Sequence, residues 1–161
     1  VEADWDHISR WCPVVASRQI LQTGKHRFRV EIKRRETGSF LARDGQIKIG
    51  FFECDLDPHE NWMETGKDHK AWYYRNLGNV YSGSRCAQSG TAPGFEPGDV
   101  VTATVNLNDG TASFSKKRIV QRRDSTVEFE TEPTTIQNVS TNGIRFGVQF
   151  DRAGPGSISA C

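Results

Sequence analysis

The chain has 161 residues, of which 35% are hydrophobic and 25% are charged, a balance typical of one globular domain with its own core. Its 21 Lys and Arg residues face 20 acidic residues, and a net charge of +1 creates no field that would gather nucleic acid or an anionic membrane. No apolar run is long enough to span a bilayer.

The first residues, Val1 to Asp4, lack an initiator Met and a signal-peptide core. We therefore expect a fragment of a larger intracellular protein, cytoplasmic or nuclear. Four cysteines are scattered along the chain at Cys12, Cys54, Cys86 and Cys161. None of their spacings matches a zinc or redox motif, so we expect free thiols, no metal and no cofactor.

In chain order, the first expected element is a short helix over residues 4 to 12, which Asp4 would open as its N-cap. We divide the chain into an N-terminal segment, residues 1–14, that packs on or flanks the rest, and a single domain, residues 15–161.

Four runs of alternating apolar and polar residues predict β-strands. Their apolar positions are Phe28, Val30 and Ile32; Ile47, Ile49 and Phe51; Val101, Ala103, Val105 and Leu107; and Ile144, Phe146, Val148 and Phe150. A period of two places one apolar face on a core and one polar face in water, as in half-buried antiparallel strands.

Turn signals and long loops separate these strands. Asp109-Gly110 lies between the strand that ends at Leu107 and the next strand, where it predicts a tight hairpin. Two polar stretches, from about Cys54 to Lys70 and from about Ser82 to Pro97, are expected to be long loops, which often carry function. Strands joined in this way, without helical periods between them, indicate a β-sandwich or barrel.

Several segments, in order, resemble SPRY domains, the core of the B30.2 module. They are Thr23–Ile32, Ile47–Phe51, Trp72–Tyr81, Phe95–Val101 and Asn106–Phe114. The most specific is Gly98-Asp99-Val100, followed by Gly110-Thr111. The resemblance implies a bent β-sandwich of two antiparallel sheets. It also implies a non-catalytic module that grips a peptide or protein surface with loops at one edge, within a larger protein such as a ubiquitin-ligase, channel or chromatin-complex subunit.

The chain departs from the family pattern in three places. Phe28 stands where the family usually has Trp, and Lys116-Lys117-Arg118 replaces its usual Asn-Gly turn. A polar stretch from Gln121 to Asn142 then delays the closing strand.

The resemblance implies three binding regions: the segment before the Gly-x-His strand, the loop after the x-x-Gly-Val strand, and the turn before the family's final strand. They map, in that order, to Trp11, Pro13 and Arg18; to Asp57, His59, Trp62 and Met63; and to Asp151, Arg152 and Gly154. Trp and Pro offer rigid apolar contacts, Arg can fork onto a carboxylate, and Gly lets a ligand backbone come close.

Rival interpretations remain open for some of these residues. Trp62 is either folded back on the domain or offered to a partner, and an exposed loop Trp would also suit a sugar- or small-ligand-binding sandwich. The loop's Cys54, Asp55, Asp57, His59, Glu60 and His69 have no standard metal-ligand spacing, so a solvated loop is the preferred interpretation. His26 is interpreted as a structural hydrogen-bonding residue.

Overall fold

The structure, a computed structural model, describes residues 14–33, 47–57, 62, 70–82, 85–88 and 92–150. Its strands are β1 (Val14–Ala16), β2 (Lys25–Glu31), β3 (Ile47–Glu53), β4 (Ala71–Arg75), β5 (Val80–Ser82), β6 (Arg85–Gln88), β7 (Asp99–Asn106), β8 (Thr111–Arg122), β9 (Ser125–Glu130), β10 (Thr134–Ile136) and β11 (Ile144–Phe150). No helix occurs among the described residues. That part of the chain therefore contains no helix that could cross a membrane. The helix expected over residues 4–12 lies outside them.

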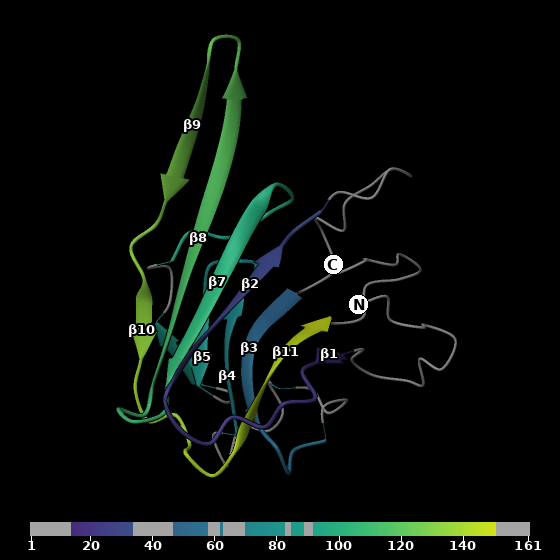
Figure 1. Cartoon of the computed structure of the whole chain (residues 1–161), viewed down its shortest axis with the longest axis vertical. Helices are drawn as coiled ribbons and strands as arrows, with labels where there is room; N and C mark the ends of the chain where they lie inside the picture. The colour runs from purple at the N-terminus through teal and green to yellow at the C-terminus, as the bar shows by residue number, and fades with distance from the viewer. Residues whose placement is uncertain are drawn as a thin grey trace, which may run out of the picture.

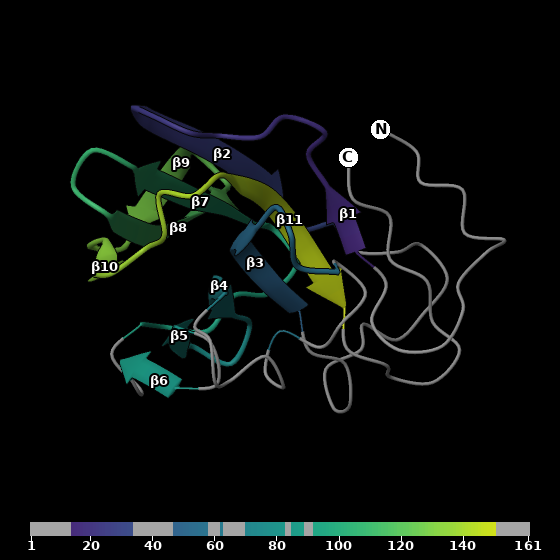
Figure 2. The same ribbon diagram turned by 90° about the horizontal axis from the view of Figure 1, so that it is seen from below.

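The strands form two sheets that lie face to face as the layers of a sandwich (Figures 1 and 2). Sheet A has the order β1-β11-β3-β4-β5-β6, and sheet B has the order β10-β8-β7-β2, with β9 paired to β8. Every pairing is antiparallel. The predicted all-β sandwich of two antiparallel sheets is confirmed.

The main core fills the space between the two sheets. Phe28 of β2 stacks on Phe146 of β11 with ring centroids 4.3 Å apart, and it forms a T-shaped pair with Phe51 at 6.0 Å between centroids. Phe51 also contacts Phe114 of β8, which ties the centre of sheet A to sheet B. Phe28 therefore fills the core with an aromatic ring at the position where the SPRY pattern usually has Trp.

The central strands β3 and β4 of sheet A are buried on both faces, which corrects the expectation that the strand through Ile47, Ile49 and Phe51 is half-buried. All residues of β3 from Ile47 to Phe52 are buried, as are those of β4 from Ala71 to Tyr74. The outer strand of sheet B behaves as the alternation predicts, because β2 exposes every second residue from Lys25 onward. Something must therefore cover the outer face of sheet A.

Local turn chemistry follows the sequence closely. The hairpin between β7 and β8 turns through residues 107–110, where Gly110 takes a φ of +62°, a left-handed value that suits glycine. His26 is bound through Nε2 to the Thr23 carbonyl oxygen at 2.7 Å, which confirms the structural role expected for it.

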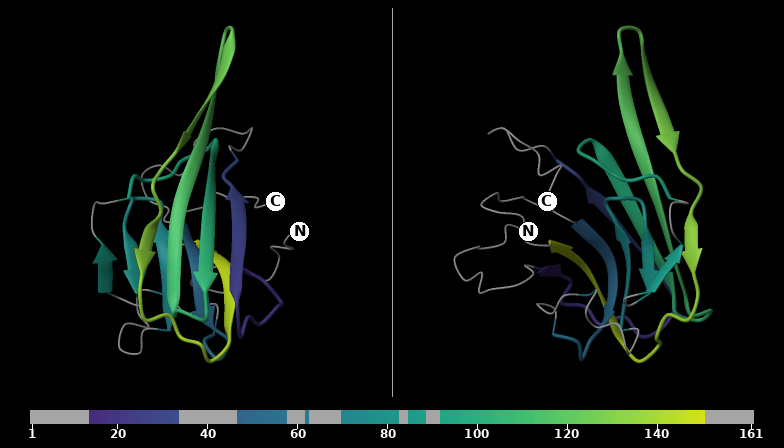
Figure 3. Two further views of the ribbon diagram at one scale, coloured as in Figure 1. Left: turned by 60° about the vertical axis from the view of Figure 1, so that its left-hand side comes forward. Right: turned by 180° about the vertical axis from the view of Figure 1, so that it is seen from behind.

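Two stretches contain more regular structure than the sequence predicts. The polar segment from Gln121 to Asn142 forms the end of β8, all of β9 and all of β10, and the segment from Ser82 to Pro97 includes β6. β8 runs on past the end of its pairing with β7 at Arg118, and with β9 it forms a two-stranded ribbon that projects beyond the sandwich (Figures 1 and 3).

Candidate functional site

The outer face of sheet A carries a second hydrophobic cluster, which we call the outer layer. It consists of Phe52, Leu56, Trp62, Ala71, Tyr73 and Tyr81, with Val14 packed against it. Trp62, from the segment between β3 and β4, lies against Phe52 at 5.4 Å and Tyr73 at 5.7 Å between ring centroids. Tyr73 in turn stacks on Tyr81 of β5 at 5.1 Å. This layer accounts for the burial of sheet A on its outer side.

Two glycines on neighbouring strands make room for the outer layer. Gly50 of β3 and Gly147 of β11 are directly paired. A Cβ atom on Gly147 would lie 2.9 Å from a ring carbon of Phe52, and one on Gly50 would lie 2.1 Å from the Trp72 carbonyl oxygen. Neither position has space for a side chain, so the aromatic residues lie directly on the backbone of the sheet.

A buried polar pair anchors the outer layer at one end. Lys48 of β3 and Gln149 of β11 are direct neighbours across the ladder, and both are fully buried. The Gln149 side-chain carbonyl oxygen accepts hydrogen bonds from Lys48 Nζ and from the backbone N–H of Trp62, each at 3.1 Å. Lys48 Nζ also lies 5.8 Å from the centre of the Tyr73 ring. Gln149 thus holds the Trp62 backbone to the end of β11.

The burial of Trp62 corrects its assignment as an exposed anchor. Its side chain is 0% exposed, so of the two interpretations the structure supports the one in which Trp62 folds back on the domain. The physical reason is local: Phe52, Tyr73 and Tyr81 lie on the outer face of sheet A and would otherwise be exposed, and the indole covers them.

The other two described candidates, Arg18 and Asp57, are exposed. Arg18 follows Ser17, whose backbone N–H donates to the Phe146 carbonyl oxygen of β11. Arg18 therefore lies beside the middle of β11, about 10 Å of strand from Gln149. Asp57 follows Leu56, which belongs to the outer layer.

The remaining candidates lie outside the described residues: Trp11, Pro13, His59, Met63, Asp151, Arg152 and Gly154. The described residues next to them in the chain do meet. Val14 pairs with Gln149 and packs on the outer layer, and Trp62 is bonded to the same Gln149. We call this junction of Val14, Trp62, Lys48 and Gln149 the β1–β11 end of sheet A.

Sequence reasoning missed Lys48 and Gln149. Each alternates with apolar neighbours, so each reads as a residue that faces water. The only available signals were Gly50 and the adjacent pair Phe51-Phe52, which breaks the alternation and hints at an apolar outer face.

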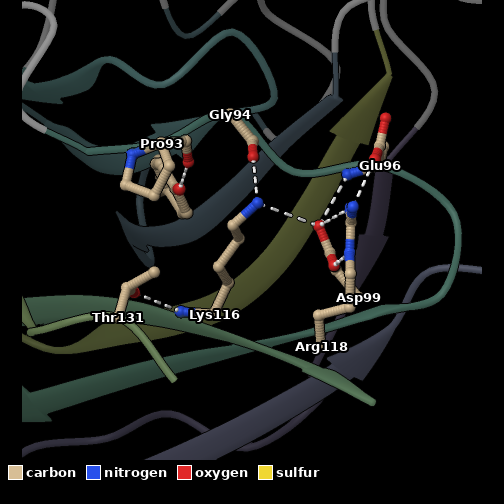
Figure 4. A network of polar contacts seen from close by, with 8 residues as sticks. Pro93, Gly94, Glu96, Asp99, Lys116, Arg118 and Thr131 are labelled. Carbon is tan, nitrogen blue, oxygen red and sulfur yellow. Dashed lines mark hydrogen bonds and ion pairs between the residues drawn. The ribbon is translucent and has the colours of Figure 1, made fainter. Parts of the chain in front are cut away.

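A second polar network, at the start of β7, was also missed (Figure 4). The Asp99 side chain is fully buried and bonds Arg118 Nε at 2.5 Å and Nη2 at 2.9 Å, Lys116 Nζ at 3.2 Å, and the backbone N–H of Glu96 at 3.0 Å. Arg118 also pairs with the exposed carboxylate of Glu96. Asp99 belongs to the Gly-Asp-Val motif, and its role is to tie β7 and β8 to the segment that precedes them.

The same network perturbs two titratable groups. Burial by itself would raise the pKa of Asp99, but the hydrogen bonds from Arg118, Glu96 and Lys116 outweigh it and hold that pKa below its ordinary value. Burial and the nearby Asp99 charge raise the pKa of Tyr74 to about 12. The Tyr74 hydroxyl donates to the Pro93 carbonyl oxygen, so the neutral phenol is the form that the fold favours.

The polar residues of the segment after β3 are paired where the structure describes them. Asp55 accepts a hydrogen bond from Lys70 Nζ at 2.8 Å, and this bond lowers the pKa of the Asp55 carboxyl. Within the described ranges, no group of three or more His, Cys, Asp or Glu side chains is placed to hold a metal ion. His59, Glu60 and His69 lie outside those ranges. Cys54 is a free thiol.

The fold has clear counterparts among solved structures. The chain is similar to the SPRY domain of human HERC1, with a TM-score of 0.65 and 18% identity over 95% of this chain and 84% of that one. It is also similar to stonustoxin, with a TM-score of 0.53 and 14% identity over 86% of this chain and 20% of that one. A third similar structure is the TRIM65 PSpry domain, with a TM-score of 0.50 and 14% identity over 88% of this chain and 70% of that one.

No protein-family profile and no curated protein sequence matches the chain. The structural likeness nevertheless agrees with an all-β architecture of two antiparallel sheets, and the chain has a SPRY-like fold.

Proposed function

We propose that the chain is a non-catalytic protein-interaction module that binds a peptide or protein surface at the β1–β11 end of sheet A. The observation that carries the proposal is the convergence there of three chain regions on one rigid support. Val14, Trp62 and Gln149 each adjoin or belong to a region that the SPRY resemblance implies in binding, and both Val14 and Trp62 contact Gln149.

The support is rigid because sheet A is packed on both faces. A binding surface gains affinity when its supporting residues are already fixed, since less conformational freedom is lost on binding. The Gln149 bond to the Trp62 backbone and the outer layer beneath it supply that fixation. Trp11, Pro13, Asp151, Arg152 and Gly154 are the residues proposed to contact the partner, with Arg152 as the main polar contact.

The setting that fits this proposal is a reducing, intracellular compartment, in which the domain selects the partner for a larger protein. The free thiol of Cys54 is compatible with such a compartment. The sugar-binding alternative relied on an exposed Trp62 and loses that support, because the indole is buried.

Selection of a displayed peptide library on the chain, followed by titration of one recovered peptide, tests the proposal. We expect the selected peptides to share a short motif, and Arg152→Ala to weaken binding at least about tenfold, the loss of roughly 1.4 kcal/mol. Lys25→Ala, on the exposed edge strand of sheet B, is the matched control and should leave affinity unchanged.

Arg18→Ala tests an alternative location beside the middle of β11. If this variant loses affinity while Arg152→Ala keeps it, the partner binds near Phe146 and the proposed location is wrong. Selected peptides without any common motif would contradict the proposed function itself.

A further inference from the structure

Strand β2 is a sheet edge that the proposed function does not use. It pairs with β7 on one side, and no other described strand pairs with it. Figure 2 shows it as the outermost strand of sheet B. The segment before it bonds to β11 instead, through the backbone N–H groups of Ser17 and Leu21. The other edge of β2 is therefore open among the described residues.

The open edge presents the backbone groups of every second residue. The Ile32 N–H donates to the Asp99 carbonyl oxygen at 2.9 Å, and the Ile32 carbonyl oxygen accepts from the Gly98 N–H at 2.8 Å, so Ile32 faces the β7 side. Because backbone groups alternate along a strand, residues with even numbers face β7 and those with odd numbers face the open edge. Arg27 and Arg29 belong to the second group, and their backbone groups have no partner in the described part of the chain.

The side chains at the same odd-numbered positions carry positive charge. Lys25, Arg27 and Arg29 are exposed on the outer face of sheet B, and none of them forms an ion pair within the described ranges. Their neighbours across β7 and β8 on this face are uncharged: Asn106, Thr104 and Thr102, then Thr111, Ser113 and Ser115. Glu31, at the end of the strand, pairs with Lys33 at 3.5 Å. No residue of these neighbouring positions therefore neutralises the three basic side chains.

The core beside this edge is incompletely covered. Three hydrophobic residues pack against the main core but are only partly buried, namely Val15, Phe28 and Phe146. They belong to β1, β2 and β11, which end the two sheets on one side of the sandwich, where the rings of Phe28 and Phe146 stack. Apolar side chains placed next to β2 would remove more of this surface from water.

We propose that the open edge of β2 accepts an extended segment of a partner protein in which acidic and apolar residues alternate. The acidic side chains lie beside Lys25, Arg27 and Arg29, and the apolar side chains turn inward beside Phe28. Side chains on one face of a strand recur about every 7 Å, so each carboxylate meets one cation. Main-chain hydrogen bonds supply affinity in this mode of binding, and the alternating side chains supply specificity.

The edge selects this occupant by its charge and by its backbone together. A basic segment would place like charges opposite one another, which is destabilising. A single-stranded nucleic acid would meet the cations but would leave the strand-forming N–H and C=O groups of Arg27 and Arg29 unused. An acidic extended peptide uses both the cations and the backbone groups.

A short synthetic peptide that alternates Glu with Val tests the proposal by fluorescence anisotropy. We expect it to bind the chain, with affinity that falls as salt is raised because the attraction is electrostatic. The same peptide with Lys in place of Glu should not bind, because its charges are those of the edge.

Methylation of the peptide backbone tests strand pairing separately from charge. One version of the Glu/Val peptide carries N-methyl groups on its Glu residues and the other on its Val residues, so both keep the same charge. Because the N–H groups of successive residues point to opposite sides of a strand, only one of the two sets can bond to β2. One version should therefore lose affinity at least about tenfold, and the other should keep it.

Variants assign the site on the chain. Arg27→Glu should weaken the Glu/Val peptide at least about tenfold. Arg123→Glu makes the same change of charge at an exposed position in the turn between β8 and β9, and it should leave the affinity unchanged. A melting curve for each variant checks that the sandwich is intact, and Arg29→Gln, which only removes a charge, decides the matter if Arg27→Glu disturbs β2.

Three results would overturn the proposal. They are the absence of binding by the Glu/Val peptide, equal binding by the wild type and Arg27→Glu, and equal binding of the two methylated peptides. Tighter binding of a single-stranded oligonucleotide than of the Glu/Val peptide would assign the basic face to a nucleic acid instead. A dimer detected by light scattering that Arg27→Glu converts to a monomer would assign the edge to a second copy.

Discussion

The two sheets of the sandwich use the same alternating strands in different ways. Sheet B keeps a polar outer face, where Arg27, Thr104 and Ser113 lie side by side across β2, β7 and β8. Sheet A has an apolar outer face covered by Trp62 and its aromatic neighbours. We propose the candidate site on sheet A because the outer layer there holds the ends of its strands in place.

The largest effect on stability is expected when Trp62 is removed from the outer layer of sheet A. Trp62→Ala should reduce the free energy of unfolding by about 3–5 kcal/mol, because a fully buried indole leaves a cavity over Phe52 and Tyr73. Urea denaturation measures the change. Leu77→Ala, at an exposed position, should change stability by less than about 0.5 kcal/mol. A small effect of Trp62→Ala would mean that the outer layer does not form.

Asp99→Asn should be the next largest effect. The variant removes the charge that Arg118 and Lys116 face in the buried network, and we expect a loss of about 3 kcal/mol in unfolding free energy. Glu96→Gln changes an exposed partner of Arg118 and should cost under about 1 kcal/mol.

The dependence of the unfolding free energy on pH in acid gives a further test of the Asp99 network. Because folding lowers the pKa of Asp99, its contribution is present above the unfolded value of 3.8 and is lost as the pH falls through the folded value. The Asp99→Asn variant should therefore lose less stability than the wild type in acid. Equal acid sensitivity of the two proteins would contradict the network.

Tyr74 gives a smaller effect with the opposite pH dependence. Its pKa is raised from 10.0 to about 12, so the stability that it contributes is present below pH 10.0 and is lost between there and about 12. Tyr74→Phe should cost about 1 kcal/mol at neutral pH through its lost hydrogen bond to Pro93, and should remove this alkaline loss. Unfolding curves at about pH 9 and about pH 11 compare the two proteins.

The smallest effect is expected on the open face of sheet B. Thr102 lies on the outer side of β7 and is half-buried. Thr102→Val should change the unfolding free energy by no more than about 0.5 kcal/mol, because the face has no second layer to disturb among the described residues. A loss comparable to that of Trp62→Ala would show that this face is also covered.

The contrast between the sheets explains what the sequence could predict. The alternation at Phe28 and Val101, together with the turn at Gly110, specifies strands and a sandwich, because these signals are local. Lys48 and Gln149 are buried where the backbone of Trp62, from a separate segment, is bonded to Gln149, and no periodicity predicts that contact. The same limit applies to β9, whose polar residues form a strand only because β8 supplies a partner.

The candidate site stays a prediction for most of its residues, which lie outside the described ranges. The described residues that adjoin or belong to the implied regions do meet, because Val14 pairs with Gln149 and the Trp62 backbone is bonded to it. Trp62 proved to be part of the support, since an aromatic residue in a loop reads the same whether it faces the domain or a partner.

Hydrogen exchange of the chain with and without a selected peptide tests the central claim most directly. If the partner binds at the β1–β11 end of sheet A, the peptide slows amide exchange in β1 and in the Gly147–Phe150 half of β11, and leaves β2 and β7 unchanged. Slowed exchange on β2 and β7, with no change in β1 or β11, would contradict the assignment of binding to the β1–β11 end of sheet A.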